Sequence, residues 1–187
     1  MIEVNNISKT FDGKAVIKNL SFTVNKGECV ALTGASGAGK TTLLRIIAGL
    51  EKPDSGEVIF TENSRCTFVF QENRLLENKS ALENILAVIP DKERALYFLE
   101  KCGLKEDADK KAGLFSGGMK RRLSIARALA YGGEIYFLDE PLRELDEETL
   151  HTVASLIKEE ITGKTAILIT HDSFSLEYLS DRIINIQ

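Results

Sequence analysis

The chain has 187 residues, 28 acidic and 24 basic side chains, and a formal net charge of −4 at pH 7. This length fits one domain with a sizeable core. The acidic balance, with both signs mixed along the chain, argues against a dedicated nucleic-acid binder. A solvated helix start explains the one basic cluster, at residues 120–122, as well as a ligand does. No apolar run approaches the roughly 20 residues that a membrane span needs, and residues 1–4 resemble a strand, not a signal peptide.

The first third of the chain is predicted to consist mainly of strands joined by short turns. Alternating apolar residues predict a pair of antiparallel strands, and a short apolar run precedes a glycine-rich segment that opens a helix. In chain order, strands are predicted over residues 2–7, 20–24, 28–33, 57–60 and 65–71, turns at 12–14, 25–27 and 53–56, and helical spacing over 43–50.

The rest of the chain alternates helices with short apolar strands. Such alternation predicts an α/β fold with a mainly parallel sheet covered on both faces, to which an N-terminal antiparallel β subdomain and a small helical subdomain are attached. Helical patterns span residues 80 to about 104 (with breaks at Pro90 and Gly103), 118–131, 146–161 and 173–179, a polar loop 107–113, and strands 135–138, 165–170 and 183–186. The residues expected to face inward from the helix over 118–131 are Leu123, Ile125, Ala126, Leu129 and Ala130.

Three isolated cysteines, Cys29, Cys66 and Cys102, lack metal-ligand spacing. An odd number without a pairing pattern predicts free thiols in a reducing compartment, not a disulfide framework. The fold therefore has to depend on its apolar core.

A glycine-rich segment between the third strand and the first helix fits the phosphate-binding pattern G-x-x-x-x-G-K-[ST]. Its glycines let the backbone N–H groups and the following helix N-terminus face phosphate oxygens. Lys40 is expected to reach the β- and γ-phosphates, and the Thr41 hydroxyl to ligate Mg²⁺. The alternative is a glycine-rich turn that contains Lys-Thr by chance, which both flanking elements disfavour. The predicted ATP-binding residues are Gly34, Ala35, Ser36, Gly37, Ala38, Gly39, Lys40, Thr41 and Thr42.

Polar residues end three of the later strands, where an open α/β sheet binds its ligands. Asp139 is predicted to hold Mg²⁺ directly or through water, and Glu140 to polarise the attacking water. A solvated acidic pair is the alternative. Gln71 and His171 also follow apolar strands, so both are expected near the same crevice. A lone histidine at a strand end is more often structural, and His151 is expected on a helix surface.

Ser116-Gly117-Gly118-Met119, set between a strand-end glutamine and a strand-end Asp-Glu pair, resembles the signature of ABC-type ATPases. The order of motifs agrees with that family over nearly the whole chain, which implies the P-loop NTPase fold, ATP and Mg²⁺ as cofactors and ATP hydrolysis as the activity. The roles that the resemblance implies are adenine stacking by Phe11, a base and sugar contact by Val16, Mg²⁺ and water contact by Gln71, general base catalysis by Glu140, a γ-phosphate contact by His171, and a dimer-crossing loop at Asp146.

The resemblance also implies an assembly. Ser116, Gly117 and Gly118 would bind the γ-phosphate of a nucleotide held by a second copy or a paralogous subunit, in a head-to-tail dimer. The dimer would drive membrane-spanning transporter subunits, act indirectly with a solute-binding protein, and lie peripherally on the cytoplasmic face of the cell membrane. We expect residues 1–187 to form a single ATP-binding domain, with a helical subdomain at roughly 72–130 and no C-terminal regulatory domain. Coupling to the membrane subunits is expected over residues 71–84, although leucines there could equally be core.

Residues 69–76 and Met119 resemble the ATP-binding subunits of importers for nitrate, sulfonates and taurine. Departures from the family pattern are Phe115 for the usual Leu, Arg143 and Glu144 for small residues, Asn73 for Pro, and Glu77-Asn78 for Pro-Trp. Alternatives to an importer are a non-transport ABC ATPase (metal-cluster assembly, DNA or translation), an exporter or lipid-release ATPase, and a weakened subunit paired with a different ATPase.

Overall fold

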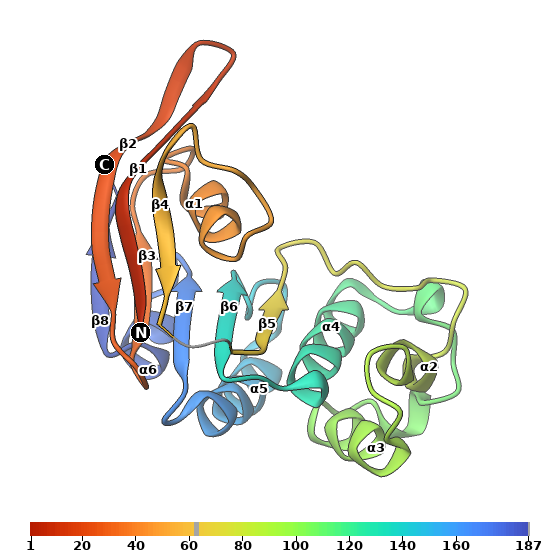
Figure 1. The fold of residues 1–187 in the computed structure, drawn as a ribbon. Coiled ribbons are helices and arrows are strands. Elements are labelled where there is room, and N and C mark those ends of the chain that lie inside the picture. Colours follow the sequence, from red (N-terminus) through yellow and green to blue (C-terminus); the bar gives the residue numbers. More distant parts are fainter. Residues whose placement is uncertain (62–63, 187) are drawn as a thin grey trace.

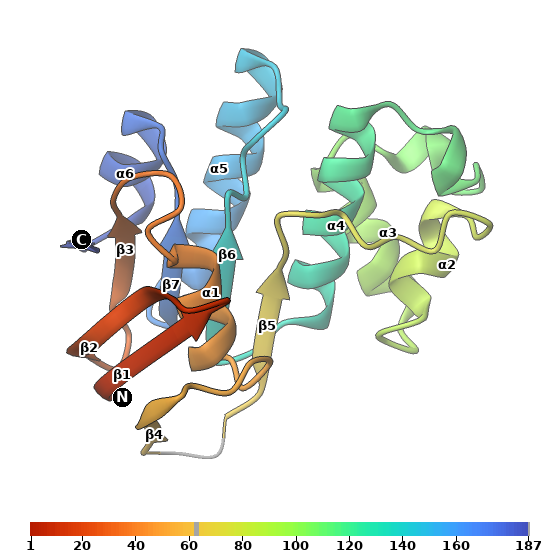
Figure 2. The same ribbon diagram turned by 90° about the horizontal axis from the view of Figure 1, so that it is seen from above.

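The computed structural model describes residues 1–61 and 64–186. A parallel sheet forms its centre, and helices lie on both faces of this sheet (Figure 2). Neighbouring strands follow the order β5 (Cys66–Val69), β6 (Ile135–Asp139), β7 (Thr165–Ile169), β3 (Cys29–Thr33) and β8 (Arg182–Asn185). Every residue of β6 and β7 is buried, as expected for strands covered on both sides.

Alternate residues of the central strands enter two separate cores. Tyr136 and Leu168 pack with α5 (Glu147–Ile161) on one face, whereas Phe137 and Ile167 pack with α1 (Lys40–Ile47) on the other. This division follows from the period of two along a strand. Helix α6 (Ser173–Leu179) completes the first face.

An antiparallel sheet lies over α1 and the second core (Figure 1). Its order is β2-β1-β4, from β1 (Ile2–Phe11), β2 (Lys14–Val24) and β4 (Ser55–Phe60). The strand predicted over residues 2–7 is longer than expected, because register shifts after Val4 break the alternating pattern without ending the pairing. Asp12 and Gly13, with φ of 48° and 78°, form the two-residue hairpin loop.

The helical part lies beside β5, away from the antiparallel sheet (Figure 1). It comprises α2 (Ala81–Leu86), α3 (Lys92–Lys101) and α4 (Gly117–Tyr131), with short 3₁₀ turns at Lys105–Asp107 and Ala112–Leu114. The breaks predicted at Pro90 and Gly103 are confirmed, while the loop predicted over 107–113 contains part of both 3₁₀ turns. The five residues predicted to face inward from α4 are all buried.

The strand predicted over residues 65–71 ends earlier, at Val69. The carbonyl oxygens of Phe70 and Gln71 accept hydrogen bonds from the Arg121 side chain, at 2.6 and 3.3 Å, instead of continuing the pairing with β6. Gln71 therefore lies two residues beyond the strand.

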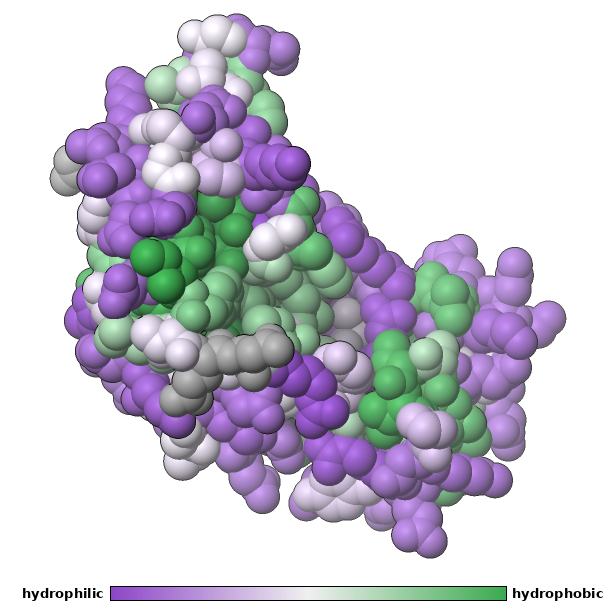
Figure 3. All heavy atoms as spheres, viewed as in Figure 1, coloured by the Kyte–Doolittle hydropathy of each residue, from purple (hydrophilic) through white to green (hydrophobic). Residues whose placement is uncertain are grey.

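The free state of the cysteines agrees with the sequence analysis. All three cysteines are free thiols, and burial raises the pKa of Cys29 and Cys102 to about 12. Much of the surface shown in Figure 3 is hydrophilic, with apolar areas in the hollow beside β4 and over the helical part. In the described part of the chain, no helix has the length and apolar character needed to cross a membrane.

Candidate functional site

The phosphate-loop segment joins β3 to α1 in a conformation that requires its glycines. Gly34, Gly37 and Gly39 have φ of 144°, 81° and 84°. A Cβ on Gly34 would collide with the Ile186 carbonyl group, and one on Gly39 would lie 2.6 Å from Cγ1 of Val16. The loop is therefore held between Ile186, which follows β8, and Val16 of β2, and α1 starts directly after it.

The N-terminus of α1 is suited to an anion. Its N-cap residue, Gly39, has no side chain to accept from the first N–H groups of the helix. Lys40 is 6% exposed, and its Nζ donates to the carbonyl oxygens of Gly34 and Ala35, both at 2.9 Å. The buried ammonium group is thus held inside the curve of the loop.

A cavity of about 370 Å³ lies in front of this loop, at the carboxyl ends of the central strands. The structure brings predicted residues from five distant segments together around it. Its lining residues are Phe11, Val16, Ser36, Gly37, Gly39, Lys40, Thr41, Thr42, Gln71, Asp139, Glu140, Ile169 and His171. Gly34, Ala35 and Ala38 belong to the loop but do not line the cavity.

Three oxygen-bearing side chains at this cavity fit a magnesium ion. The Thr41 hydroxyl lies 3.3 Å from Oδ1 of Asp139, and Gln71 lines the same cavity. Hydroxyl, carboxylate and amide oxygens are the hard ligands that Mg²⁺ takes, usually alongside water and phosphate. Asp139 is 2% exposed, and its burial raises the pKa of its carboxyl. A nearby cation would therefore favour the charged form of this group.

Glu140 and His171 face each other at the same cavity. Oε1 of Glu140 lies 3.5 Å from Nε2 of His171. Glu140 has φ of 50°, which is unfavourable for a residue with a Cβ, and its N–H donates to the Ile169 carbonyl at 2.9 Å. Burial raises the pKa of the Glu140 carboxyl, and the nearby His171 partly opposes this rise. A carboxylate with these properties can accept a proton from water.

Arg121 is a residue of this site that the sequence analysis assigned wrongly. The solvated-helix interpretation of residues 120–122 fails for it, because Arg121 is only 2% exposed. Burial lowers its pKa to about 10, so it stays charged at neutral pH. The spacing of Arg121 in the sequence indicates this burial, since Arg121 shares a helix face with the buried Ser124, Ile125 and Ala128.

The Arg121 guanidinium joins α4 to the ends of two strands. It donates to the carbonyl oxygens of Asp139 at 3.0 Å, Glu140 at 2.6 Å and Pro141 at 2.9 Å, all just at or after the end of β6. It also donates to the Phe70 carbonyl beyond β5, at 2.6 Å. One side chain therefore fixes the backbone that carries both acidic residues of the site.

Ser116, Gly117 and Gly118 do not line the phosphate cavity of their own chain. Ser116 is exposed and caps α4, accepting from the Met119 N–H at 3.2 Å. Glu144 lies against this helix start, since a Cβ on Gly117 would be 3.5 Å from its Oε2. Asp146 also lies outside the cavity, as the N-cap of α5. Within one chain these residues form a second, outward-facing surface.

Comparison with known proteins agrees with this arrangement. The family model "ABC transporter" matches residues 17–143. The chain is 39% identical to a probable amino-acid ABC transporter ATP-binding protein of Haemophilus influenzae, over 98% of the chain and 83% of that protein. It is 36% identical to an aliphatic sulfonates import ATP-binding protein of Shouchella clausii, over 100% and 77%. It also resembles a dimeric ATP-binding cassette solved in a post-hydrolysis state with ADP and Pi, at a TM-score of 0.91 and 32% identity, over 100% and 94% of the two chains.

Proposed function

The chain belongs to the ABC transporter family of ATP-binding proteins, and from this premise we propose that it is the ATP-hydrolysing subunit of a small-solute importer. The resemblance and the P-loop α/β fold expected from the sequence are confirmed, and members of this family are ATPases. The importer assignment rests on relatives named for the import of aliphatic sulfonates and for amino acids. These names favour it over the metal-cluster, DNA-related and exporter alternatives.

In the proposed reaction, the phosphate loop and Lys40 hold the ATP phosphates. Phe11 is 44% exposed at the mouth of the cavity, where its ring is available to stack on adenine, with Val16 beside the base and sugar. Thr41, Gln71 and Asp139 would hold Mg²⁺, which when bound neutralises charge that develops on the phosphates. Gln71 would also report the state of the membrane subunits.

Glu140 and His171 carry the proposed proton transfer and γ-phosphate contact. Glu140 orients a water molecule for in-line attack and accepts its proton, and the raised pKa of its carboxyl strengthens it as a base. His171, which lies 3.5 Å from Glu140, would contact the γ-phosphate. Arg121 keeps the backbone of Glu140 in its strained conformation.

Two copies, arranged head to tail, would complete each site. Each chain carries the cavity at the phosphate loop and the outward-facing Ser116-Gly117-Gly118 surface, so a two-fold pair would place the second against the γ-phosphate bound by the first. Asp146 would lie in the loop that crosses between the copies. The similar dimeric cassette with ADP and Pi supports this pairing. ATP binding would close the pair and hydrolysis would open it.

The helical part offers a surface for the membrane subunits. Leu76 and Leu114 are 47% and 70% exposed, and their segments are joined by a hydrogen bond from the Gly113 N–H to the Glu77 carbonyl at 2.9 Å. Leu75 and Leu82, by contrast, pack against the core. We propose that the exposed pair docks a membrane-spanning subunit, which holds the chain at the cytoplasmic face of the membrane. Residues 1–187 would act as one ATP-binding domain with a helical subdomain at roughly 72–130.

The observation that carries the proposal is that the phosphate loop, Asp139, Glu140 and His171 share one cavity. The test measures ATPase activity and ATP affinity of the wild type and of Glu140→Gln. We expect the variant to keep ATP affinity and to lose about 10²–10⁴-fold in rate, the contribution of a positioned general base. Two chains that bind ATP and are equally inactive would instead indicate a weakened subunit.

Transport is tested separately by purifying the tagged chain from membranes. Multi-span membrane proteins should co-purify, and Leu114→Asp should release them without lowering ATP affinity. Recovery of soluble scaffold proteins instead would overturn the transport assignment while leaving the ATPase assignment standing.

A further inference from the structure

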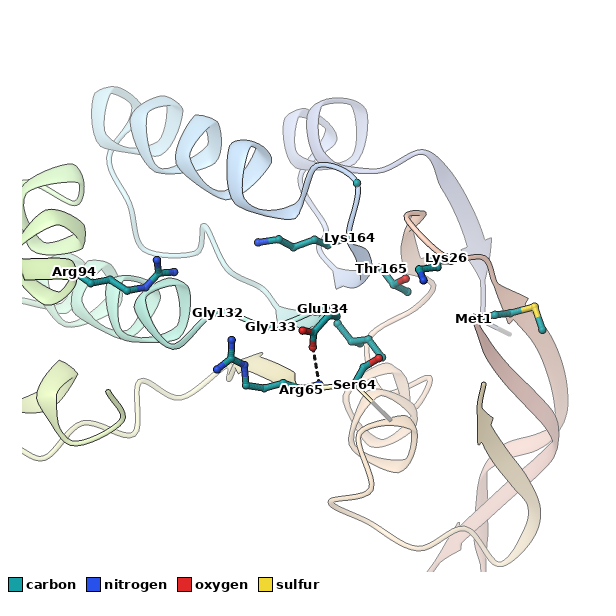
Figure 4. Close-up of a pocket in the computed structure, with 12 residues that line it drawn as sticks. Met1, Lys26, Ser64, Arg65, Arg94, Gly132, Gly133, Glu134, Lys164 and Thr165 are labelled. Atoms are coloured by element: carbon teal, nitrogen blue, oxygen red, sulfur yellow. Dashed lines mark hydrogen bonds between the residues drawn. The ribbon is translucent and has the colours of Figure 1, made fainter. Parts of the chain in front are cut away.

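A second cavity, of about 380 Å³, lies at the amino ends of β5, β6 and β7 (Figure 4). Its lining includes the residues directly before these strands, namely Arg65, Glu134 and Lys164. The phosphate cavity lies at the opposite, carboxyl ends of the same sheet. Because β6 and β7 are five residues long, the two cavities are separated by roughly 15 Å of strand.

This amino-edge cavity is cationic. The described residues that line it include four cationic side chains, Lys26, Arg65, Arg94 and Lys164, and one carboxylate, Glu134. Glu134 accepts from the backbone N–H of Arg65 at 2.7 Å. Among the described residues, no carboxylate forms an ion pair with the guanidinium of Arg65 or Arg94. The excess of Arg65, Arg94 and Lys164 over Glu134 in this lining favours an anion.

Three of the cations point toward one space from different elements (Figure 4). Arg94 comes from α3, Arg65 from the segment before β5, and Lys164 from the turn between α5 and β7. Gly132 keeps the space in front of Arg94 open, because a Cβ there would lie 3.3 Å from Nη2 of Arg94. The cavity thus has charged groups on several sides and little bulk between them.

Neighbouring groups hold the cationic side chains in place, but they do not use all of the N–H donors of these side chains. Arg94 donates from Nε to the Ala130 carbonyl at 2.6 Å and from Nη2 to the Leu129 carbonyl at 3.3 Å, which caps α4. An arginine has five N–H donors, so three remain. The Arg65 guanidinium lies 5.3 Å from the centre of the Tyr131 ring. Capping of α4 alone explains the position of the Arg94 side chain. It does not explain why the Arg65 side chain points into the same space.

Lys164 is the least available of the three. Its Nζ lies 3.3 Å from the Tyr136 hydroxyl and 3.5 Å from a carboxylate oxygen of Glu160. Both neighbours are at long distances, and the Lys164 side chain is 36% exposed. An ion pair at this distance between partly exposed side chains stabilises only weakly. A doubly charged anion in the cavity would compete with it.

We propose that this cavity binds a small anion carrying two or more phosphate groups. Guanidinium groups match phosphate in planar, paired hydrogen bonds, and converging cations favour a multiply charged ligand over a monoanion. The volume of the cavity suits a small molecule. The site lies outside the proposed ATP site and does not depend on it. A ligand there would contact Arg94 of the helical part together with Arg65 and Lys164 at the sheet.

The test uses pyrophosphate as the probe and the Lys40→Ala chain as the background, because Lys40→Ala removes binding at the phosphate loop. Isothermal titration calorimetry at constant ionic strength should detect pyrophosphate binding in this background. Adding Arg65→Gln and Lys164→Gln should weaken the affinity at least about tenfold, since both substitutions remove charged hydrogen-bond donors to the ligand. The matched control is Lys79→Gln with Lys105→Gln, two ion-paired lysines outside the cavity. It should leave the affinity unchanged.

Melting temperatures establish that each variant is folded, and Arg65→Gln alone, at an exposed position, serves if the double variant is not. Absence of pyrophosphate binding in the Lys40→Ala background would overturn the proposal. So would equal weakening by the cavity pair and the control pair. If a polyglutamate peptide binds through Arg65 and Lys164 and pyrophosphate does not, the cavity accepts an acidic protein segment and the small-anion assignment is wrong.

Discussion

The phosphate loop and the N-terminus of α4 are both suited to phosphate, and they differ in how completely one chain builds them. At the phosphate loop, Lys40 is 6% exposed and side chains from distant strand ends share its cavity. At the N-terminus of α4, Ser116 and Gly117 are exposed, and Glu144 is the charged residue beside them. Both surfaces use helix N-termini, but only the first is enclosed by the fold.

The difference indicates which surface needs a partner. The phosphate loop has its glycine conformations and its buried lysine fixed by contacts within the chain. Ser116 caps the N-terminus of α4. Ser116 and Gly117 remain exposed, so the described chain does not enclose this helix end. This exposed surface is open to a phosphate held by another molecule, as the proposed head-to-tail pair requires.

The largest effect is expected from Lys40→Ala, which tests the enclosed surface. Loss of about two charged hydrogen bonds to phosphate, at roughly 1.5–3 kcal/mol each, should weaken ATP binding about 100-fold or more. Fluorescent-nucleotide titration measures this. Ser116→Ala should leave monomer affinity within about twofold, because Ser116 lies outside the cavity. Equal losses in both variants would mean that the two surfaces act on the same nucleotide within one chain.

Ser116→Arg tests the outward-facing surface. A large cationic side chain at the start of α4 should prevent a second copy from approaching, so ATP-driven dimerisation in the Glu140→Gln background should be lost. ATP affinity of the monomer should remain within about threefold, as for surface substitutions away from a site. Size-exclusion chromatography with light scattering reads the dimer. Intact dimerisation and hydrolysis in Ser116→Arg would contradict the shared-site proposal.

Arg121 connects the two surfaces, since it belongs to α4 and bonds to carbonyls beyond β5 and β6. In Arg121→Met these carbonyls lose their donor and the Glu140 backbone is free to relax. Misplacement of a catalytic group by about 1 Å can lower the rate about 100-fold, so kcat should fall strongly while KM for ATP changes little. Arg121→Lys should restore part of kcat. A parallel loss of ATP affinity, without any rescue by lysine, would indicate a purely structural role.

Glu144→Ala sharpens the comparison further. Its carboxylate lies against the N-terminus of α4 and opposes a phosphate there. Charge effects at a helix end amount to about 0.3–1 kcal/mol, so the variant should form the ATP-bound dimer about 2–5-fold more tightly. Arg143→Ala is the matched control, because Arg143 and Glu144 are similarly exposed and lie 3.7 Å apart. A weaker dimer in Glu144→Ala would show that this carboxylate supports the interface.

The parts of the site that local patterns encode were predictable. The strand, glycine loop and helix around Lys40 are contiguous, and Asp139, Glu140 and His171 each follow an apolar run. Alternation failed for β1 and β2, because register shifts interrupt it while the pairing continues to the hairpin. Roles that depend on contacts distant in sequence were missed. Arg121 bonds to carbonyls that are 18–51 residues away, and a basic residue at a helix start is usually solvated.

The amino-edge cavity shows the same limit more strongly. Its cationic residues, Lys26, Arg65, Arg94 and Lys164, are scattered along the chain and form no motif. The parallel arrangement of β5, β6 and β7 brings Arg65 and Lys164 together at the starts of distant strands. Arg94 joins them because its side chain bonds to carbonyls at the end of α4. Sequence periodicity predicts that such strands exist, but their order in the sheet determines which side chains meet.

The smallest expected effect concerns the stability of the enclosed surface. Burial raises the pKa of the Glu140 carboxyl above its ordinary value of 4.5, so the folded chain retains this proton at pH values where the unfolded chain has lost it. Ionisation of the buried Glu140 carboxyl therefore lowers the free energy of unfolding. This loss is absent below the unfolded pKa and grows as pH rises through the folded pKa.

Glu140→Gln removes the ionisable group and keeps the shape of the side chain. Its melting temperature should exceed that of the wild type at about pH 8, by about 2–4 °C for each kcal/mol gained, and the difference should shrink toward about pH 4. A Glu140→Gln difference that stays constant from pH 4 to 8 would mean that lost contacts, not the buried charge, set the effect.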